Sequence, residues 1–190
     1  MEENEAKYSI AIITDDAGTD YVNVLKDQLF KKIGWYHSRN SKAHITISEF
    51  ATNEDELQRI VKHLKEIAGH ENPIHLNFDG VDSYPNGAVF LAPDDTSKSP
   101  FIDMMKRIQS NLKITKSYNS KDPHLTIARK LNDENVEIAL KMFGNVKLDF
   151  NCANVVLRKF NPEIKQYEIF STDFPFLGLP PKPVAQTSLF

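Results

Sequence analysis

Two short segments of the chain pair a histidine with a hydroxyl side chain at the same spacing. They are the tetrapeptides HITI, at residues 44–47, and HLTI, at residues 124–127. In a β-strand, side chains i and i+2 lie on one face, roughly 7 Å apart. Each segment would therefore present an imidazole and a hydroxyl on one side and two aliphatic side chains on the other. Two such segments in a chain of 190 residues predict an internal duplication whose polar faces meet at one site.

These residue types are suited to displacement at phosphorus. Histidine titrates near neutral pH, so one imidazole can act as a base while the other acts as an acid. Threonine hydroxyls can hold the non-bridging oxygens of a phosphate. We therefore predict that His44 and His124 are catalytic and that Thr46 and Thr126 bind the phosphate.

Other chemistries fit the sequence less well. The two histidines have no carboxylate or cysteine companions at the spacing of a metal site. Glycines are few and scattered, and neither a P-loop nor a Gly-x-Ser-x-Gly motif is present. The sequence therefore predicts no metal and no cofactor.

The elements around the two motifs repeat in the same order. Apolar runs and alternation predict strands, and apolar residues at i, i+3 and i+4 predict helices. The first half predicts a strand over 8–14, a helix over 20–33, a motif strand over 43–50, a helix over 54–68 and a strand over 74–78. The second half predicts a strand over 88–92, a helix over 100–112 that begins at Ser99-Pro100, a motif strand over 124–129, a helix over 133–143, a strand from Val146 to about Arg158 and a strand over 167–171.

This repetition predicts an α+β fold of two pseudo-symmetric β-α-β-α-β lobes. We expect antiparallel sheets that face a central cleft, with the helices outside. The domain would cover residues 1–175, with lobe one at about 7–80, lobe two at about 87–174, and strands exchanged between the lobes. Prolines and a glycine after Pro175 predict an extended tail over 176–190.

Composition narrows the class of protein. The net charge of −3 excludes a generic polycation, so a nucleic acid would have to meet a local basic site. The single cysteine, Cys152, cannot form an internal disulfide, and we interpret it as a packed residue in a reducing compartment. No signal peptide or membrane-spanning run is apparent. We expect a cytoplasmic monomer that does not bind membranes.

The motifs resemble those of the two-histidine (2H) phosphoesterase superfamily, whose signature is a pair of H-x-[ST]-hydrophobic strands. Within it, the sequence is most similar to the bacterial branch of 2′–5′ RNA ligases and RNA 2′,3′-cyclic phosphodiesterases. The run from Pro123 to Arg129 resembles the second motif of that branch, and Phe50 stands where the branch often has an aromatic residue. Ser48-Glu49-Phe50 departs from the apolar-aromatic-glycine run that usually follows the first motif.

The resemblance implies a metal-independent hydrolase that acts on a 2′,3′-cyclic phosphate or 2′–5′ linkage of RNA or a nucleotide. The usual assignment in the family makes His124 the base and His44 the acid. Arg129 is a candidate phosphate contact, and Phe50 and Tyr36 are candidates for stacking on a base. Two alternatives keep the site: a phosphoesterase for a small cyclic phosphate that is not RNA, and a nucleotide- or RNA-binding module without turnover.

The end of the chain carries a separate motif. Gln186 to Phe190 reads QTSLF and follows the proline-rich segment. It resembles the short peptide by which bacterial proteins dock on the DNA-polymerase sliding clamp, with Gln186, Leu189 and Phe190 as the anchors. Packing of Leu189 and Phe190 on their own domain is the alternative.

Overall fold

The computed structural model describes residues 5–180, which form four helices and nine strands. The sliding-clamp motif lies outside the described residues. In chain order the elements are β1 (Ala6–Ile13), α1 (Asp16–Ile33), β2 (His44–Thr52), α2 (Glu54–His70), β3 (Ile74–Tyr84), β4 (Ala88–Pro93), α3 (Asp95–Leu112), β5 (Ser117–Asn119), β6 (Leu125–Ala128), α4 (Asp133–Phe143), β7 (Leu148–Cys152), β8 (Asn154–Asn161) and β9 (Gln166–Pro175).

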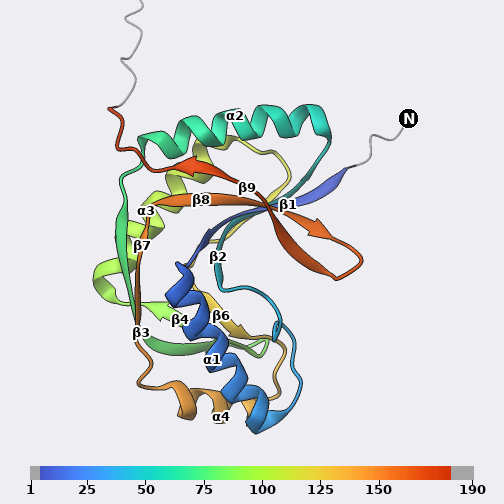
Figure 1. Cartoon of the computed structure of the whole chain (residues 1–190), viewed down its shortest axis with the longest axis vertical. Coiled ribbons are helices and arrows are strands. Elements are labelled where there is room, and N and C mark those ends of the chain that lie inside the picture. The colour runs from blue at the N-terminus through green and yellow to red at the C-terminus, as the bar shows by residue number, and fades with distance from the viewer. Residues whose placement is uncertain (1–4, 181–190) are drawn as a thin grey trace, which may run out of the picture.

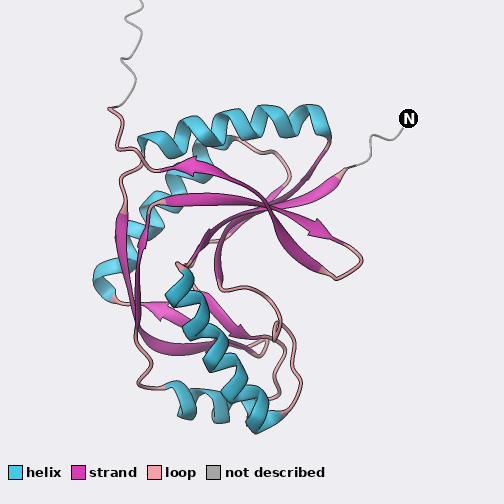
Figure 2. Ribbon diagram, viewed as in Figure 1, coloured by secondary structure: helices cyan, strands magenta, loops and turns pink. Residues whose placement is uncertain are grey.

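The strands form two antiparallel sheets, which Figure 2 shows as two separate groups. Sheet 1 has the order β5-β2-β1-β8-β9, and sheet 2 has the order β6-β4-β3-β7. Helix α2 lies along the outside of sheet 1 against β9 and α3, whereas α1 and α4 pack on sheet 2 (Figure 1). The predicted α+β class with two antiparallel sheets is confirmed.

Neither sheet is built from one contiguous half of the chain. Strand β3 belongs to the first half but lies in sheet 2, where its first part pairs with β7 and its second part with β4. Strand β8 belongs to the second half but pairs with β1 in sheet 1. Helix α1 follows β1 of sheet 1 and packs on β6 and β7 of sheet 2. The sequence boundary near residue 80 is therefore not a boundary between sheets.

The predicted strand from Val146 to Arg158 is two strands. It is interrupted at Ala153, where the chain leaves sheet 2 after β7 and enters sheet 1 as β8. The carbonyl of Ala153 accepts a hydrogen bond from the backbone N–H of Phe176 at 2.8 Å. The break carries no glycine or proline, so alternation alone could not reveal it.

Two helices begin earlier than the sequence suggests, because an aspartate caps each one. The side chain of Asp15 accepts from the N–H of Gly18 at the start of α1, and that of Asp94 accepts from the N–H of Ser97 at the start of α3. Pro100 consequently lies inside α3 and is not its first residue. The prediction of a start at Ser99-Pro100 was wrong because the aspartate cap precedes it.

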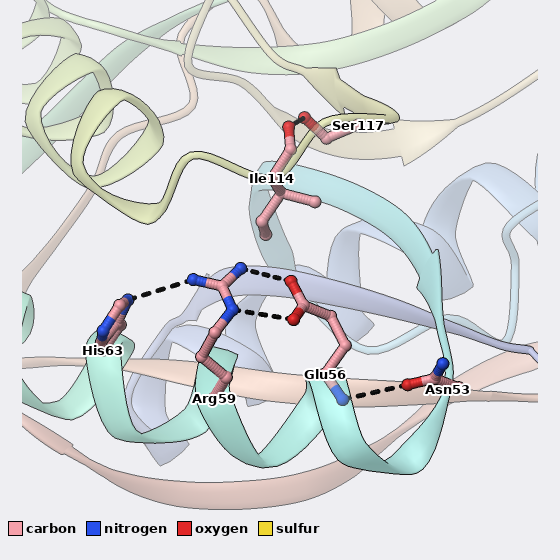
Figure 3. A network of polar contacts seen from close by, with 6 residues as sticks. All are labelled: Asn53, Glu56, Arg59, His63, Ile114 and Ser117. Atoms are coloured by element: carbon pink, nitrogen blue, oxygen red, sulfur yellow. Dashed lines mark hydrogen bonds and ion pairs between the residues drawn. The ribbon is translucent and has the colours of Figure 1, made fainter.

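The first motif strand is followed directly by α2, and Figure 3 shows how that helix starts. The side chain of Asn53 accepts a hydrogen bond from the N–H of Glu56 at 3.0 Å. On the exposed side of α2, Nε and Nη2 of Arg59 donate to the Glu56 carboxylate, and Nη1 of Arg59 donates to His63 Nδ1 at 3.3 Å. His63 is therefore part of a network of polar side chains on the surface of α2.

The segment after β9 docks on the domain. Phe176 is buried, and the N–H groups of Gly178 and Leu179 donate to the carbonyls of Glu71 and Gly69 at 2.9 and 3.0 Å. The first residues of the predicted tail thus belong to the packed structure. Within residues 5–180, no helix combines the length and apolar character needed to cross a membrane.

Candidate active site

The two motif segments have the alternation that their sequences predict. The aliphatic residues of both tetrapeptides are fully buried, whereas the histidines and threonines are half-buried. The buried side chains anchor the motif strands in the core, and the polar ones point to the opposite face. We call the side of each sheet that carries the histidine and threonine the motif face. The four aliphatic residues are Ile45, Ile47, Leu125 and Ile127.

The fold brings the two motifs together. Strands β2 and β6 are in contact, and the charge of His124 lowers the pKa of His44. Gln109 of α3 fastens the two segments, because its side-chain amide donates to the carbonyls of Ile47 and Ser120 at 2.9 and 2.8 Å. The N–H of Ser120 also donates to the carbonyl of Ile47 at 3.0 Å. The two motif segments thus lie side by side.

Both imidazoles are held in the same way. Nδ1 of His44 lies 2.7 Å from the carbonyl oxygen of Lys42, and Nδ1 of His124 lies 2.9 Å from that of Asp122. A carbonyl oxygen can only accept, so each Nδ1 must carry the proton. The neutral form of each ring then has its lone pair on Nε2. The duplicated units therefore present the same nitrogen of each imidazole for proton transfer.

The charged neighbours of the two imidazoles differ. Desolvation first, and the Arg158 guanidinium second, lower the pKa of His44 to about 3, with smaller effects from Lys26 and His124. The bond to the Lys42 carbonyl acts in the opposite direction but does not outweigh them. His44 is consequently neutral at physiological pH.

His124 instead lies beside a tyrosine–carboxylate pair. Its ring is 5.4 Å from that of Tyr84, edge to face, and 5.2 Å from that of Phe90. The Tyr84 hydroxyl donates to the Asp122 carboxylate at 2.6 Å and lies 3.5 Å from Nδ1 of His124. Burial and this carboxylate raise the pKa of Tyr84, so the phenol stays protonated.

A β-bulge changes which residues after the first motif reach the motif face. Ala11 of β1 pairs with Thr46, but the next pair joins Ile10 to Ser48, so Ile47 is the extra residue. After the bulge, the side chains of β2 point to the face opposite to the one that simple alternation from His44 predicts. Glu49 therefore shares the motif face with Thr46, which period-two alternation did not predict.

Phe50 consequently turns into the core, where it is buried and stacks on Tyr8 with ring centroids 6.0 Å apart. Tyr36 is also buried, and its hydroxyl donates to the carbonyl of Lys26 at 3.0 Å. Neither ring has a face free for a nucleobase. The prediction that Phe50 and Tyr36 stack on a base was wrong.

Arg129 keeps a place near the site. The second motif has the same bulge, since Phe90 pairs with Thr126 and Val89 with Ala128. Because of this shift, the side chain of Arg129 lies on the same face as that of Thr126. Its side chain is exposed, and its N–H donates to the carbonyl of His37 at 3.0 Å. Its role as a phosphate contact stays a prediction.

Sequence reasoning missed Arg158. This residue of β8 is 4% exposed, and its Nη2 donates to the Ser9 hydroxyl at 2.7 Å. The available signal was a charged residue directly after the apolar run at 155–157. Cys152 is buried, and burial raises the pKa of its thiol to about 12, in agreement with a packed residue.

The chain resembles known proteins in both sequence and fold. The sequence model of a family described as the 2′-5′ RNA ligase superfamily matches residues 16–162. A candidate phosphoesterase of Bacillus licheniformis is 26% identical over 94 residues, which are 48% of this chain and 54% of that protein. One from Bacillus cytotoxicus is 31% identical over 93 residues, 47% of this chain and 53% of that protein. The matched region thus spans about half the length of these relatives.

Solved structures share the fold over nearly the whole chain. E. coli LigT complexed with NADP+ superposes with a TM-score of 0.64 at 13% identity, covering 92% of this chain and 99% of LigT. TT0787 of Thermus thermophilus superposes with a TM-score of 0.63 at 14% identity, covering 90% of this chain and 98% of TT0787. At such identities the likeness establishes the fold alone.

Proposed function

Because the chain belongs to the 2′-5′ RNA ligase superfamily, we propose that it is a metal-independent phosphodiesterase that opens a 2′,3′-cyclic phosphate or cleaves a 2′–5′ linkage of RNA or a nucleotide. One observation carries the proposal: His44 and His124 have the same Nδ1 contact to a carbonyl two residues earlier, which leaves both Nε2 atoms for chemistry. A pair of imidazoles can supply both the base and the acid of a displacement at phosphorus.

The lowered pKa of His44 gives the reaction a direction. His44 is neutral and takes a proton from the attacking water while the water oxygen bonds to phosphorus. The bond from phosphorus to the 3′ oxygen breaks, and protonated His124 supplies the proton to that oxygen. The product is a 2′-phosphate with a free 3′-hydroxyl. This direction is the reverse of the one that the family resemblance implies.

The two hydroxyls complete the site in this proposal. Thr46 and Thr126 lie two residues from the histidines on the same faces, at the place where they could donate to the non-bridging oxygens. Because negative charge builds on these oxygens during displacement, hydrogen bonds to them strengthen in the transition state. Removal of either hydroxyl should therefore lower kcat more than it raises KM.

Hydrolysis of nucleoside 2′,3′-cyclic phosphates in the presence of EDTA tests the activity. We expect turnover by the wild type and a loss of about 10²-fold or more in His44→Ala and in His124→Ala. His63→Ala is the matched control, because His63 belongs to the surface network on α2 described above, where it contacts Arg59, and it should keep full activity. Full activity in both site variants would refute the assignment.

A substrate with an activated leaving group separates the two roles. A nitrophenyl phosphodiester needs no acid at its leaving oxygen, so it should restore much of the rate of His124→Ala but not that of His44→Ala. Rescue of His44→Ala alone would reverse the assignment. A panel that adds small cyclic phosphates and 2′–5′-linked dinucleotides identifies the substrate class. Tight nucleotide binding without product would favour the binding-module alternative.

A further inference from the structure

Arg158 is a buried cation that forms no ion pair with a carboxylate of the described residues 5–180. It is 4% exposed, and Nη2 donates to Ser9 Oγ at 2.7 Å. Nε is buried and has no hydrogen-bond partner within the described part of the chain. Glu49 favours the charged form of Arg158, but no carboxylate oxygen in residues 5–180 lies within 4.0 Å of the guanidinium nitrogens. A buried charge without a paired ion is costly, so an anion would be favoured there.

Strand pairing places Arg158 on the motif face of sheet 1. Arg158 pairs with Ser9, which also pairs with Glu49. Two residues further along β1, Ala11 pairs with Thr46, so all of these residues lie on one face. The ring of Tyr167 lies on one side of the guanidinium, 5.2 Å from its Cζ. The Arg158 group is thus held by neighbours on the face that carries the first motif.

The electrostatics agree with this placement. The charge of Arg158 is the second largest cause of the lowered pKa of His44, after desolvation. Burial lowers the pKa of Arg158 itself to about 10, which leaves it charged at neutral pH. The guanidinium therefore acts electrostatically on the site where a phosphate would be bound.

The duplication places a different residue at the equivalent position of sheet 2. In each sheet, the motif threonine pairs with a residue of the adjacent strand, which pairs in turn with a residue of the exchanged strand (β8 in sheet 1, β3 in sheet 2). The equivalent position is two residues further along the exchanged strand. That residue is Arg158 in sheet 1 and Tyr84 in sheet 2. Tyr84 contacts His124 and its carboxylate neighbour. The exchanged strands thus place a phenol beside the second imidazole and, in the other half, a guanidinium whose charge acts on the first imidazole.

We propose that Arg158 contacts the substrate directly and donates to a non-bridging phosphate oxygen on the side of the first motif. The inference rests on the proposed function, because it takes the phosphate of that substrate as the ligand. Bonds between a guanidinium and phosphate are charge-assisted and have matching geometry. Ser9 and Tyr167 fix the group before the anion arrives, and Thr46 donates to the same phosphate.

Inorganic phosphate binding, measured by calorimetry, tests the contact without turnover. We expect Arg158→Gln to weaken binding at least tenfold and to keep or raise the denaturation midpoint without phosphate, since an uncompensated buried charge is removed. Arg107→Gln is the matched control. Arg107 is paired with the buried Glu71 at 2.6 and 2.8 Å, so this change should lower the midpoint and leave phosphate binding unchanged.

Two further variants keep the test decisive if Arg158→Gln does not fold. Arg158→Lys retains the charge and should bind phosphate between the wild type and Arg158→Gln. Ser9→Ala frees the guanidinium and should weaken binding by a few fold. Binding by Arg158→Gln within twofold of the wild type, or by both Arg158→Lys and Ser9→Ala within that range, overturns the inference. So does a wild type that binds no phosphate at millimolar concentration.

A failure of the phosphate contact can be distinguished from a failure of the proposed activity. If the wild type binds phosphate through Arg158 but hydrolyses no cyclic phosphate or 2′–5′ linkage, the activity is refuted and the phosphate contact stands. If it hydrolyses these substrates and Arg158→Gln keeps both phosphate affinity and kcat/KM, the contact is refuted and the activity stands.

Discussion

The neutral imidazole of His44 makes the stability of the fold depend on pH. Its pKa is about 3 in the folded chain and near 6.5 in the unfolded chain. Between these values the unfolded state binds more protons, so the free energy of unfolding decreases as the pH falls from 6.5 toward 3. At pH 5, roughly 1.5 units below the unfolded value, the loss is about 2 kcal/mol. Solvent at the partly exposed ring screens the effect, so we expect about 1–2 kcal/mol.

Urea unfolding at pH 7 and pH 5 measures this contribution. The wild type should lose about 1–2 kcal/mol more than His44→Asn between these two pH values, because asparagine does not titrate. Arg158→Gln should reduce the pH-dependent loss, since the guanidinium is one cause of the lowered pKa. Arg107→Gln is the control, because Arg107 is not among those causes. Equal losses in wild type and His44→Asn would refute the reasoning.

Three further substitutions test the scaffold and the second imidazole. Gly87→Ala should lower the free energy of unfolding by about 2–4 kcal/mol in urea, since the residue has φ +76° and an added Cβ would lie 2.1 Å from the carbonyl oxygen of Leu131. Lys26→Met should cost about 1–3 kcal/mol and accelerate proteolysis of the loop before the first motif, because the buried ammonium donates to two loop carbonyls. Tyr84→Phe should lower kcat about tenfold at unchanged KM in the cyclic phosphate assay, because the phenol that bridges Asp122 to the second imidazole is lost.

The sequence was sufficient for the parts of the site that depend on local periodicity. His44 and Thr46, and their counterparts 80 residues later, lie on one face of an extended segment whatever surrounds them. The buried aliphatic residues between them fix that face against the core. The repetition of elements in the two halves was equally readable, and it led to the correct fold class.

Periodicity failed where the backbone departs from it. The bulge at Ile47 has no glycine or proline to mark it. Because of it, the side chain of Glu49, and not that of Phe50, lies on the motif face. The sequence could not assign Arg158 to the site, and the reason is different. The residues of the first motif that share its face lie on β2, more than 100 residues away, and only the pairing of β8 and β2 with β1 brings them together. Strand pairing of this kind is a tertiary property.

The exchange of β3 and β8 also has a consequence for biosynthesis. When the chain has emerged from the ribosome only as far as the end of β3, β1 lacks its neighbour β8, and β3 has neither β4 nor β7 to pair with. Neither half is therefore an independent folding unit, and strand pairs this distant in sequence form slowly. A nascent chain that stops before β8 exposes one edge of β1. We expect sheet 1 to be completed only after β8 and β9 are synthesised, so that Arg158 joins the site after both motif strands have been made.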